Sequence, residues 1–190
     1  MPVFPRLQPV NTLWWLHGCR SDFAPPVALV LSAANSIDVE AGTDLWATAA
    51  GLAGWLREHA DGPASGRVST QEFEAARLLR DRLRALIADG DETGFDAAAR
   101  ALPIKVAVVE GVPALAPVAD GAGGAIARIA AAAATAALDG SWDRIKLCAA
   151  DDCRWAFYDE SRNHSRTWCS MRVCGNRTKT RVYRARHQPA

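Results

Sequence analysis

The chain has 190 residues, of which 49% are hydrophobic and 23% charged, and its formal net charge is +1. This composition is ordinary for a soluble globular protein and excludes little more than a charge-rich or low-complexity chain. The charge is unevenly distributed, because residues 1–140 hold 11 basic and 16 acidic side chains, whereas residues 141–190 hold 11 basic and 5 acidic ones. A basic tail on an acidic body suggests that the tail has a polyanionic partner.

The first 26 residues are rich in Pro and Trp and are predicted to be mostly irregular. They lack the basic start and the clean apolar stretch of a signal peptide. The most apolar run of the chain, residues 129–138, is too short and too rich in Ala to span a bilayer. We therefore expect a cytoplasmic protein with no membrane partner, in which clustered cysteines are more often metal ligands than disulfides.

Two apolar segments open the predicted body. Residues 27–37 are buried, but their period does not distinguish a strand from a helix. Residues 42–60 carry apolar side chains at the three-to-four spacing of one helix face, which predicts an amphipathic helix. Either Thr43 or Asp44 is a suitable cap for its first turn.

The clearest helix covers residues 69–90. Ser69 and Glu72 have the spacing of a capping box, and Gly90 is a typical stop. The other elements predicted for the body are a helix over 93–102, a β-hairpin over 104–118 that turns at residues 110–111, and a helix over 123–140. We place a domain boundary near residue 140, where the Ala-rich character ends and Arg, Trp and Cys become frequent.

The body carries only weak signals of chemistry. The glycines at 121–126 hint at a phosphate loop, but no parallel-strand unit surrounds them, and glycines at a helix start explain them better. The acids Asp38 and Glu40 lie at expected loop edges, where solvation is the default. Because no catalytic motif is present, we expect no enzyme; an enzyme with its site in the body is a third hypothesis, which a deep polar pocket would support.

Four cysteines follow the predicted boundary in two equally spaced pairs. Cys148, Cys153, Cys169 and Cys174 form the pattern C-x4-C-x15-C-x4-C. A structural zinc ion binds four soft ligands in a tetrahedron, and two cysteine pairs on facing knuckles supply them. We predict one structural Zn²⁺ with all four positions filled, which leaves no metal-bound water for catalysis. Unrelated buried thiols or a disulfide are the alternative, and Cys19 is expected to be a buried thiol without a partner.

Residues 141–190 offer only a thin core, so a metal is expected to hold this module together. A strand over 154–160 should follow the first cysteine pair, and the second pair should lead directly into a helix over 170–186. His164 and His187 are alternative ligands in principle. His164 lies in a polar loop, where we expect it to be solvated.

The predicted C-terminal helix is strongly basic. From Arg162 to Arg186 there are eight basic residues and no acidic one, so the Glu–Lys pairs common on helices are absent. A helical wheel places one narrow, less polar face between two basic stripes, and we expect that face to lie over the zinc. It comprises Cys174, Thr178, Val182 and Ala185.

Such a density of positive charge is typical of phosphate contact, and a helix fits the major groove of DNA. We therefore predict DNA as a partner. The candidate contact residues are Arg172, Asn176, Arg177, Lys179, Arg181, Arg184 and Arg186. Asn176 equally suits a role in capping or orienting a knuckle. A solvated surface, or a surface that docks on an acidic protein partner, is the alternative.

Residues 148–186 closely resemble the CGNR zinc finger, whose name is spelled by residues 174–177. The matching features are both C-x4-C pairs, FYDESRN, RTWCSM and the basic tail. The resemblance implies that the four cysteines bind zinc and that the finger binds DNA. The preceding region resembles the ABATE domain through ALVLSAANSI, DLWATAAGLAGWL and the Asp139-Gly140 approach to the finger.

The ABATE resemblance implies a transcription regulator with a role in stress responses. Relatives carry Asp-Phe at the positions of Ser32 and Ala33, shortly before Asn35 and Ser36. Sensing of an unidentified small-molecule effector by this domain is a hypothesis from architecture alone. Taken together, the sequence predicts a mainly α protein with a β-hairpin: a helical body over 1–140 and a four-cysteine zinc finger over 141–190 that ends in a basic helix.

Overall fold

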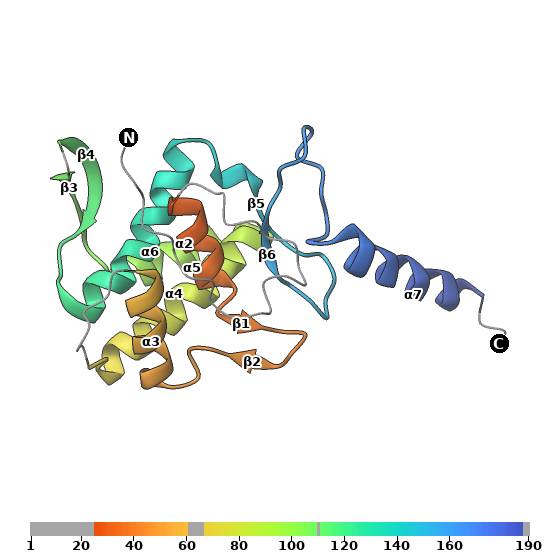
Figure 1. Cartoon of the computed structure of the whole chain (residues 1–190), viewed down its shortest axis with the longest axis horizontal. Helices are drawn as coiled ribbons and strands as arrows, with labels where there is room; N and C mark the ends of the chain where they lie inside the picture. Colours follow the sequence, from red (N-terminus) through yellow and green to blue (C-terminus); the bar gives the residue numbers. More distant parts are fainter. Residues whose placement is uncertain (1–24, 61–66, 110, 188–190) are drawn as a thin grey trace, which may run out of the picture.

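The computed structural model describes residues 25–60, 67–109 and 111–187 (Figure 1). The predictions for residues 1–24, which include Cys19, and for a loop at 61–66 lie outside the described residues. The described part is mainly helical, with small two-stranded sheets and a four-cysteine cluster followed by a helix. The predicted fold class is therefore confirmed.

Helix α6 (Gly121–Leu138) forms the centre of the body. By length and composition it is apolar enough to cross a membrane, but 61% of it is buried inside the protein, which is the position of a core helix. Its Ala side chains are small, so neighbouring helices approach closely. Helices α2 (Pro25–Ala34), α3 (Ala49–His59) and α4 (Thr70–Asp89) all pack against it. The apolar segment predicted over 27–37 is thus a helix over residues 27–34, and Ile37 begins strand β1 (Ile37–Asp38).

Helix α4 begins and ends where the sequence predicts. The hydroxyl of Ser69 accepts a hydrogen bond from the Glu72 N–H at 3.2 Å, and the Glu72 carboxylate accepts one from the Ser69 N–H at 2.8 Å. Gly90 ends the helix with a left-handed φ of 71°, which favours glycine. The next helix, α5 (Glu92–Ala99), corresponds to the one predicted over 93–102.

The glycine run at the start of α6 belongs to helix packing. The Glu72 carboxylate accepts a hydrogen bond from the Gly123 N–H at 3.0 Å, so an acid of the protein satisfies a free N–H of the first turn. A Cβ on Gly124 would lie 2.2 Å from the carbonyl oxygen of Ala119. Glycine is required there by this close approach, which favours the interpretation as a helix start over a phosphate loop.

The helix predicted over 42–60 starts later than expected. Residues Thr43–Asp44 form the short strand β2, which pairs with β1 (Ile37–Asp38), and α3 begins only at Ala49. Thr48 is the cap, since its hydroxyl accepts a hydrogen bond from the Gly51 N–H at 3.0 Å. The caps predicted at Thr43 and Asp44 are wrong.

Asp44 has a tertiary role that explains this difference. Its carboxylate accepts hydrogen bonds from the Trp46 N–H and from the buried guanidinium of Arg80, each at 2.7 Å. The ion pair with Arg80 on α4 fixes residue 44 in the β1–β2 turn and keeps it out of the helix. Leu45, predicted on the apolar face, is consequently 55% exposed.

A β-hairpin is present as predicted. Strand β3 (Ile104–Val109) pairs antiparallel with β4 (Val112–Pro117), so the chain reverses between Val109 and Val112. Gly111 has a φ of 83°, which glycine adopts without strain. The hairpin packs against α6 through β4 and leaves several valines of its outer side exposed.

Strands β5 (Ile145–Leu147) and β6 (Ala156–Tyr158) connect the body to the cysteine-rich segment. Ile145 and Ala156 are buried in the same core as the body helices. The Asn35 side chain donates to the Ala156 carbonyl at 2.9 Å and accepts from the Ala156 N–H at 2.7 Å. Arg84 donates to the carbonyls of Ala34, at 2.6 Å, and Arg154, at 2.9 Å. The two predicted units therefore share a core at β5 and β6.

Helix α7 (Asn176–Arg186) extends away from the rest of the molecule, at the opposite end from the β3–β4 hairpin (Figure 1). It follows directly on a short π-helical turn, η2 (Met171–Gly175), against which it mainly packs. The predicted strand and C-terminal helix of the module are both present. The helix projects from the body and leaves most of its surface exposed.

Candidate metal centre and basic helix

The four predicted cysteines come together in one buried cluster. Cys148 follows β5, Cys153 precedes β6, Cys169 precedes η2 and Cys174 lies within it. All four are free thiols, and their sulfur atoms lie within 4.8 Å of one another. The alternative of unrelated thiols does not fit this arrangement.

The spacing of the sulfur atoms suits a tetrahedral zinc ion. The Cys153–Cys169 and Cys169–Cys174 Sγ···Sγ distances are both 3.7 Å. Zn–S bonds of about 2.3 Å in a tetrahedron place sulfur atoms about 3.8 Å apart, whereas a disulfide requires about 2.05 Å. The residues present thus fit one zinc ion, which would supply a structural crosslink.

The charges of the clustered thiolates also favour binding of a cation. Hydrogen bonds from Cys153 and Cys169 hold the pKa of the Cys148 thiol well below its usual value. The same contacts raise the pKa of Cys169, because a second thiolate beside the first is unfavourable. Four thiolates cannot form together at this separation unless a cation neutralises them.

Short-range hydrogen bonds form the first knuckle. The N–H of Cys148 donates to the Trp155 carbonyl at 2.8 Å, and the N–H groups of Cys153 and Arg154 donate to the Ala150 carbonyl at 2.9 and 3.0 Å. Arg154 has a left-handed φ of 52°, which turns the chain out of the knuckle and into β6. The body then fixes this turn, because the Arg154 carbonyl accepts from Arg84.

The second knuckle is built into the helix start. Ser170 caps η2 by accepting a hydrogen bond from the Val173 N–H at 3.3 Å. A Cβ on Gly175 would lie 2.5 Å from Met171 Sδ, so glycine leaves room for the Met171 side chain over this turn. The Asn176 side chain donates to the Arg172 carbonyl at 3.1 Å. Asn176 therefore helps to orient the second knuckle, which is the second role that the sequence suggested for this residue.

A second, small hydrophobic core surrounds the cysteines. It comprises Ala150, Trp155 and Phe157, with Trp168 packed against it. Val173 and Val182, which the sequence also assigned to the core of the module, are 37% and 42% exposed. The core is thus thinner than predicted, which increases the dependence of this segment on its metal.

Asp159 organises the loop between the two cysteine pairs, and sequence reasoning did not single it out. Its fully buried carboxylate accepts hydrogen bonds from Lys146 Nζ at 2.7 Å and from the N–H groups of Arg166, at 2.9 Å, and Ser161, at 3.0 Å. Burial alone would raise its pKa, but these hydrogen bonds outweigh burial and hold the pKa below its usual value. Lys146 also donates to the His164 carbonyl.

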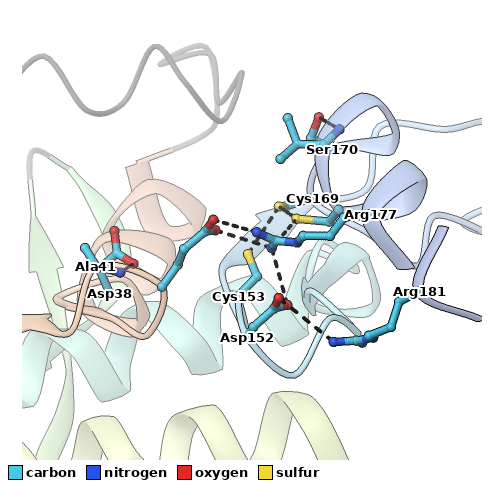
Figure 2. A network of polar contacts seen from close by, with 11 residues as sticks. Asp38, Ala41, Asp152, Cys153, Cys169, Ser170, Arg177 and Arg181 are labelled. Carbon is cyan, nitrogen blue, oxygen red and sulfur yellow. Dashed lines mark hydrogen bonds and ion pairs between the residues drawn. The ribbon is translucent and has the colours of Figure 1, made fainter. Parts of the chain in front are cut away.

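Arg177 connects the metal cluster to the body, as Figure 2 shows. Its guanidinium contacts both carboxylate oxygens of Glu40, at 2.6 and 3.4 Å, and Asp152 at 3.3 Å. It also lies 3.7 Å from Cys174 Sγ, where positive charge would offset a thiolate. The hydrogen bond that Arg177 donates to Glu40 raises the pKa of Arg177 above its ordinary value.

The turn between β1 and β2 brings Glu40 to this position. Asp38 accepts a hydrogen bond from the Ala41 N–H at 2.9 Å, and Gly42 completes the turn with a φ of 65° (Figure 2). Glu40 lies at a loop edge and is exposed, as predicted from the sequence, but its pairing with Arg177 was not predicted. The pairing of Asp152 with Arg177 was easier to anticipate from the sequence, because Asp152 lies between Cys148 and Cys153, which must approach the start of the basic helix.

The predicted DNA-contacting residues fall into different environments. Arg177 and, at 4.0 Å, Arg181 pair with acids of the same chain. Arg172, Lys179 and Arg184 are exposed, and none has an acidic partner within ion-pair distance in the described part of the chain. Arg186 ends α7, and its side chain lies outside the described residues.

The less polar face of α7 does not cover the metal cluster along its length. Cys174 is buried and Thr178 half-buried, but Val182 and Ala185 are exposed because the helix points away from the cluster. The prediction that this face lies over the zinc is therefore wrong beyond the first turn. His187 lies at the far end of the helix, with Nδ1 2.9 Å from the Tyr183 carbonyl oxygen.

Comparison with family models identifies both parts of the chain. Residues 144–187 match the CGNR zinc finger. Residues 24–144 match the ABATE model, described as "Putative stress-induced transcription regulator", over more than half of the chain. The chain belongs to the ABATE family. Its ABATE domain carries the Asn35 and Glu40 contacts, and its CGNR finger carries the cysteine cluster. The description of the family thus names transcription regulation. A search of curated proteins finds no match.

The ABATE residues near the departure from the family pattern are buried at the end of α2. Ser32 and Ala33 are buried in this helix, and the Ser32 hydroxyl has no hydrogen-bond partner among the described residues. The Ser36 hydroxyl donates to the Ala33 carbonyl at 2.8 Å and lies 3.4 Å from Arg80, so its contacts stay within the ABATE domain. Asn35 alone of these residues joins the ABATE domain to the finger, through Ala156.

Proposed function

We propose that this protein is a DNA-binding transcription regulator, in which one zinc ion bound by Cys148, Cys153, Cys169 and Cys174 orders the CGNR finger. The ordered finger presents the basic helix α7 to duplex DNA. The observation that carries the proposal is that α7 projects from the body (Figure 1) and that Lys179 and Arg184 on it are exposed, with no acidic partner within ion-pair distance in the described part of the chain. Such a helix is suited to phosphate contact in and beside a DNA groove.

The candidate DNA contacts on η2 and α7 differ in whether they already pair with an acidic side chain. Arg172, Lys179 and Arg184 are exposed and available. Arg177 and Arg181 reach phosphates only by leaving Glu40 and Asp152. Asn176 and Arg186 complete the set proposed from the sequence.

Binding to genomic DNA fragments at low salt tests this proposal. We expect the logarithm of the binding constant to fall linearly with the logarithm of salt concentration, with a slope of about −0.9 for each phosphate neutralised. A variant in which Arg172, Lys179 and Arg184 are all changed to Ala should bind weakly. Its matched control changes Arg57, Arg77 and Arg100 of the ABATE domain, which are exposed, to Ala. The proposal fails if the wild-type protein binds no fragment.

One observation favours a second candidate, a finger that docks on an acidic protein. Arg177 and Arg181 already bind carboxylates within the chain, so this side of α7 accepts acidic groups. A pull-down that yields one protein partner, whose binding persists after nuclease treatment, would support this function. For the ABATE domain, effector sensing stays a hypothesis, and we assign no catalytic role to either part.

A further inference from the structure

An open groove of about 420 Å³ runs along one side of α7. We call its lining residues the groove face: Trp168, Thr178, Lys179, Val182, Tyr183 and His187. All except Trp168 belong to α7 or to the residue that ends it. The groove therefore lies on the projecting helix and outside the body.

Two large apolar side chains are exposed on the groove face. Val182 is 42% exposed and Tyr183 is 64% exposed. The Tyr183 ring stacks on the ring of His187, with centroids 4.2 Å apart and an angle of 25° between the planes. The stack orders the tyrosine ring without burying it. Val182 and Tyr183 thus add exposed apolar surface to a strongly polar helix.

The charge on α7 differs between its two sides. At about 100° per residue, Arg177 and Arg181 point to the side opposite Lys179. Glu40 and Asp152 neutralise these two arginines. Lys179 has no acidic partner within ion-pair distance among the described residues. The groove face thus combines an unpaired cation with exposed apolar groups, which makes a polyanion with apolar edges the complementary ligand.

We propose that the groove face is the side of α7 that enters the major groove of duplex DNA. In this arrangement Lys179 contacts a phosphate, and Val182 and Tyr183 pack against thymine methyl groups. The inference rests on the proposed function and adds to it the orientation of the helix and the kind of base it contacts. The major groove is where the thymine C5-methyl group lies at the base edge of duplex DNA.

Arg177 and Arg181 then act as positioning residues. They hold the opposite side of α7 against Asp152 and, through Arg177, against Glu40 of the ABATE domain. The third residue of their stripe, Arg184, points the same way and is exposed, with no acidic partner within ion-pair distance in the described chain. Lys179→Ala and Arg184→Ala therefore compare the two sides of α7, because each change removes one exposed positive charge from the same helix.

The test uses duplexes selected from a random pool by the full-length, zinc-loaded protein. Lys179→Ala should lower affinity about 10-fold and reduce the salt slope by about 0.9, whereas Arg184→Ala, on the opposite side of the helix, should lower affinity less than about threefold. Arg57→Ala, at an exposed position of the ABATE domain, is the control and should change neither the affinity nor the slope. Tyr183→Ala should lower affinity about 10-fold without changing the slope, because an apolar contact releases no counterions. Tyr183→Phe keeps the ring and should bind like the wild type.

Replacing thymine by deoxyuracil in the selected duplex removes single methyl groups. The wild type should bind the deoxyuracil duplex about fourfold more weakly for each contacted methyl group that is removed. The variant with both Val182→Ala and Tyr183→Ala should bind the thymine and deoxyuracil duplexes equally well. Zinc content and helical circular dichroism equal to the wild type exclude misfolding as the cause.

Three results overturn this inference while leaving DNA binding intact: equal losses for Lys179→Ala and Arg184→Ala, wild-type affinity in the groove-face variants, or tighter binding to single strands than to duplexes. If the wild-type protein selects no duplex at all, the proposed function fails and the inference fails with it.

Discussion

Arg177 and Glu40 lie 137 residues apart in the sequence and form a two-point ion pair, with N–O distances of 2.6 and 3.4 Å. One residue belongs to the CGNR motif and the other to the β1–β2 turn of the ABATE domain. The pair links the helix that is proposed to contact DNA to the domain that is proposed to regulate it.

The strength of this link is measurable by a double-mutant cycle. We expect Glu40→Gln and Arg177→Gln to show a coupling of about 0.5–1 kcal/mol in urea denaturation, because both side chains are partly exposed to solvent. The control cycle pairs Arg177→Gln with Asp96→Asn on α5, which has no contact with Arg177 and should give no coupling. A null coupling between Glu40 and Arg177 would show that the contact does not contribute in solution.

Metal analysis should return about one zinc per chain. Cys169→Ser should lose the zinc and unfold η2 and α7, because the cysteine cluster is their main attachment. Proteolysis should then remove the region after residue 168 and leave the ABATE domain intact. Cys19→Ser serves as the control and should keep the metal. A metal-free protein with a protease-resistant C-terminal helix would contradict this expectation.

Asn35 should contribute strongly to stability. Changing Asn35 to Leu leaves the N–H and the carbonyl of Ala156 buried without partners, so we expect a loss of about 2–4 kcal/mol in the free energy of unfolding. Thermal or urea denaturation measures this loss. Asn163→Ala, in an exposed loop, is the control and should change stability by less than about 0.5 kcal/mol. Equal stability of the two variants would refute a role for Asn35 in joining the domains.

Asp159 should make stability depend on pH. Its pKa is lowered in the folded protein, so its contribution is complete above the unfolded value of about 3.9 and is lost as pH falls toward the folded value. Asp159→Asn should cost about 2–4 kcal/mol at pH 7, because it leaves Lys146 without its buried partner.

The pH test compares Asp159→Asn with the wild type in excess zinc. The difference in unfolding free energy should stay constant between pH 5 and 8 and should narrow below about pH 4. Asp143→Asn, at an exposed position, is the control and should show no such difference. A difference that grows as pH falls would have the wrong sign for a carboxylate stabilised in its charged form.

Local signals in the sequence predicted the fold well where the partners are close along the chain. The capping box of Ser69 and Glu72 acts over three residues, and the reversal at Gly111 depends on its own φ. The start of α3 was missed because Asp44 pairs with Arg80, 36 residues away. A carboxylate that suits a cap cannot be distinguished, from the sequence alone, from one that is needed elsewhere.

The metal cluster could be predicted from the sequence because four cysteines at fixed spacing have few other roles. The charge environment of α7 could not be predicted, because the acidic residues that pair with it come from other segments. The lack of acids between Arg162 and Arg186 suggested two equivalent basic stripes, but Glu40 and Asp152 neutralise part of one. The contacts of Asn35 and Asp159 depend on backbone groups of other strands and loops, which carry no side-chain signature.

The shared core at β5 and β6 has a consequence for how the protein acquires its metal. The ABATE domain packs Ile145 and Ala156 and binds the Arg154 carbonyl, so we expect these contacts to order the first knuckle before a zinc ion binds. A zinc ion then needs to immobilise only the second knuckle, and the entropy lost on binding is smaller than for an excised finger. The ABATE domain thereby raises the affinity of a site to which it contributes none of the four sulfur ligands.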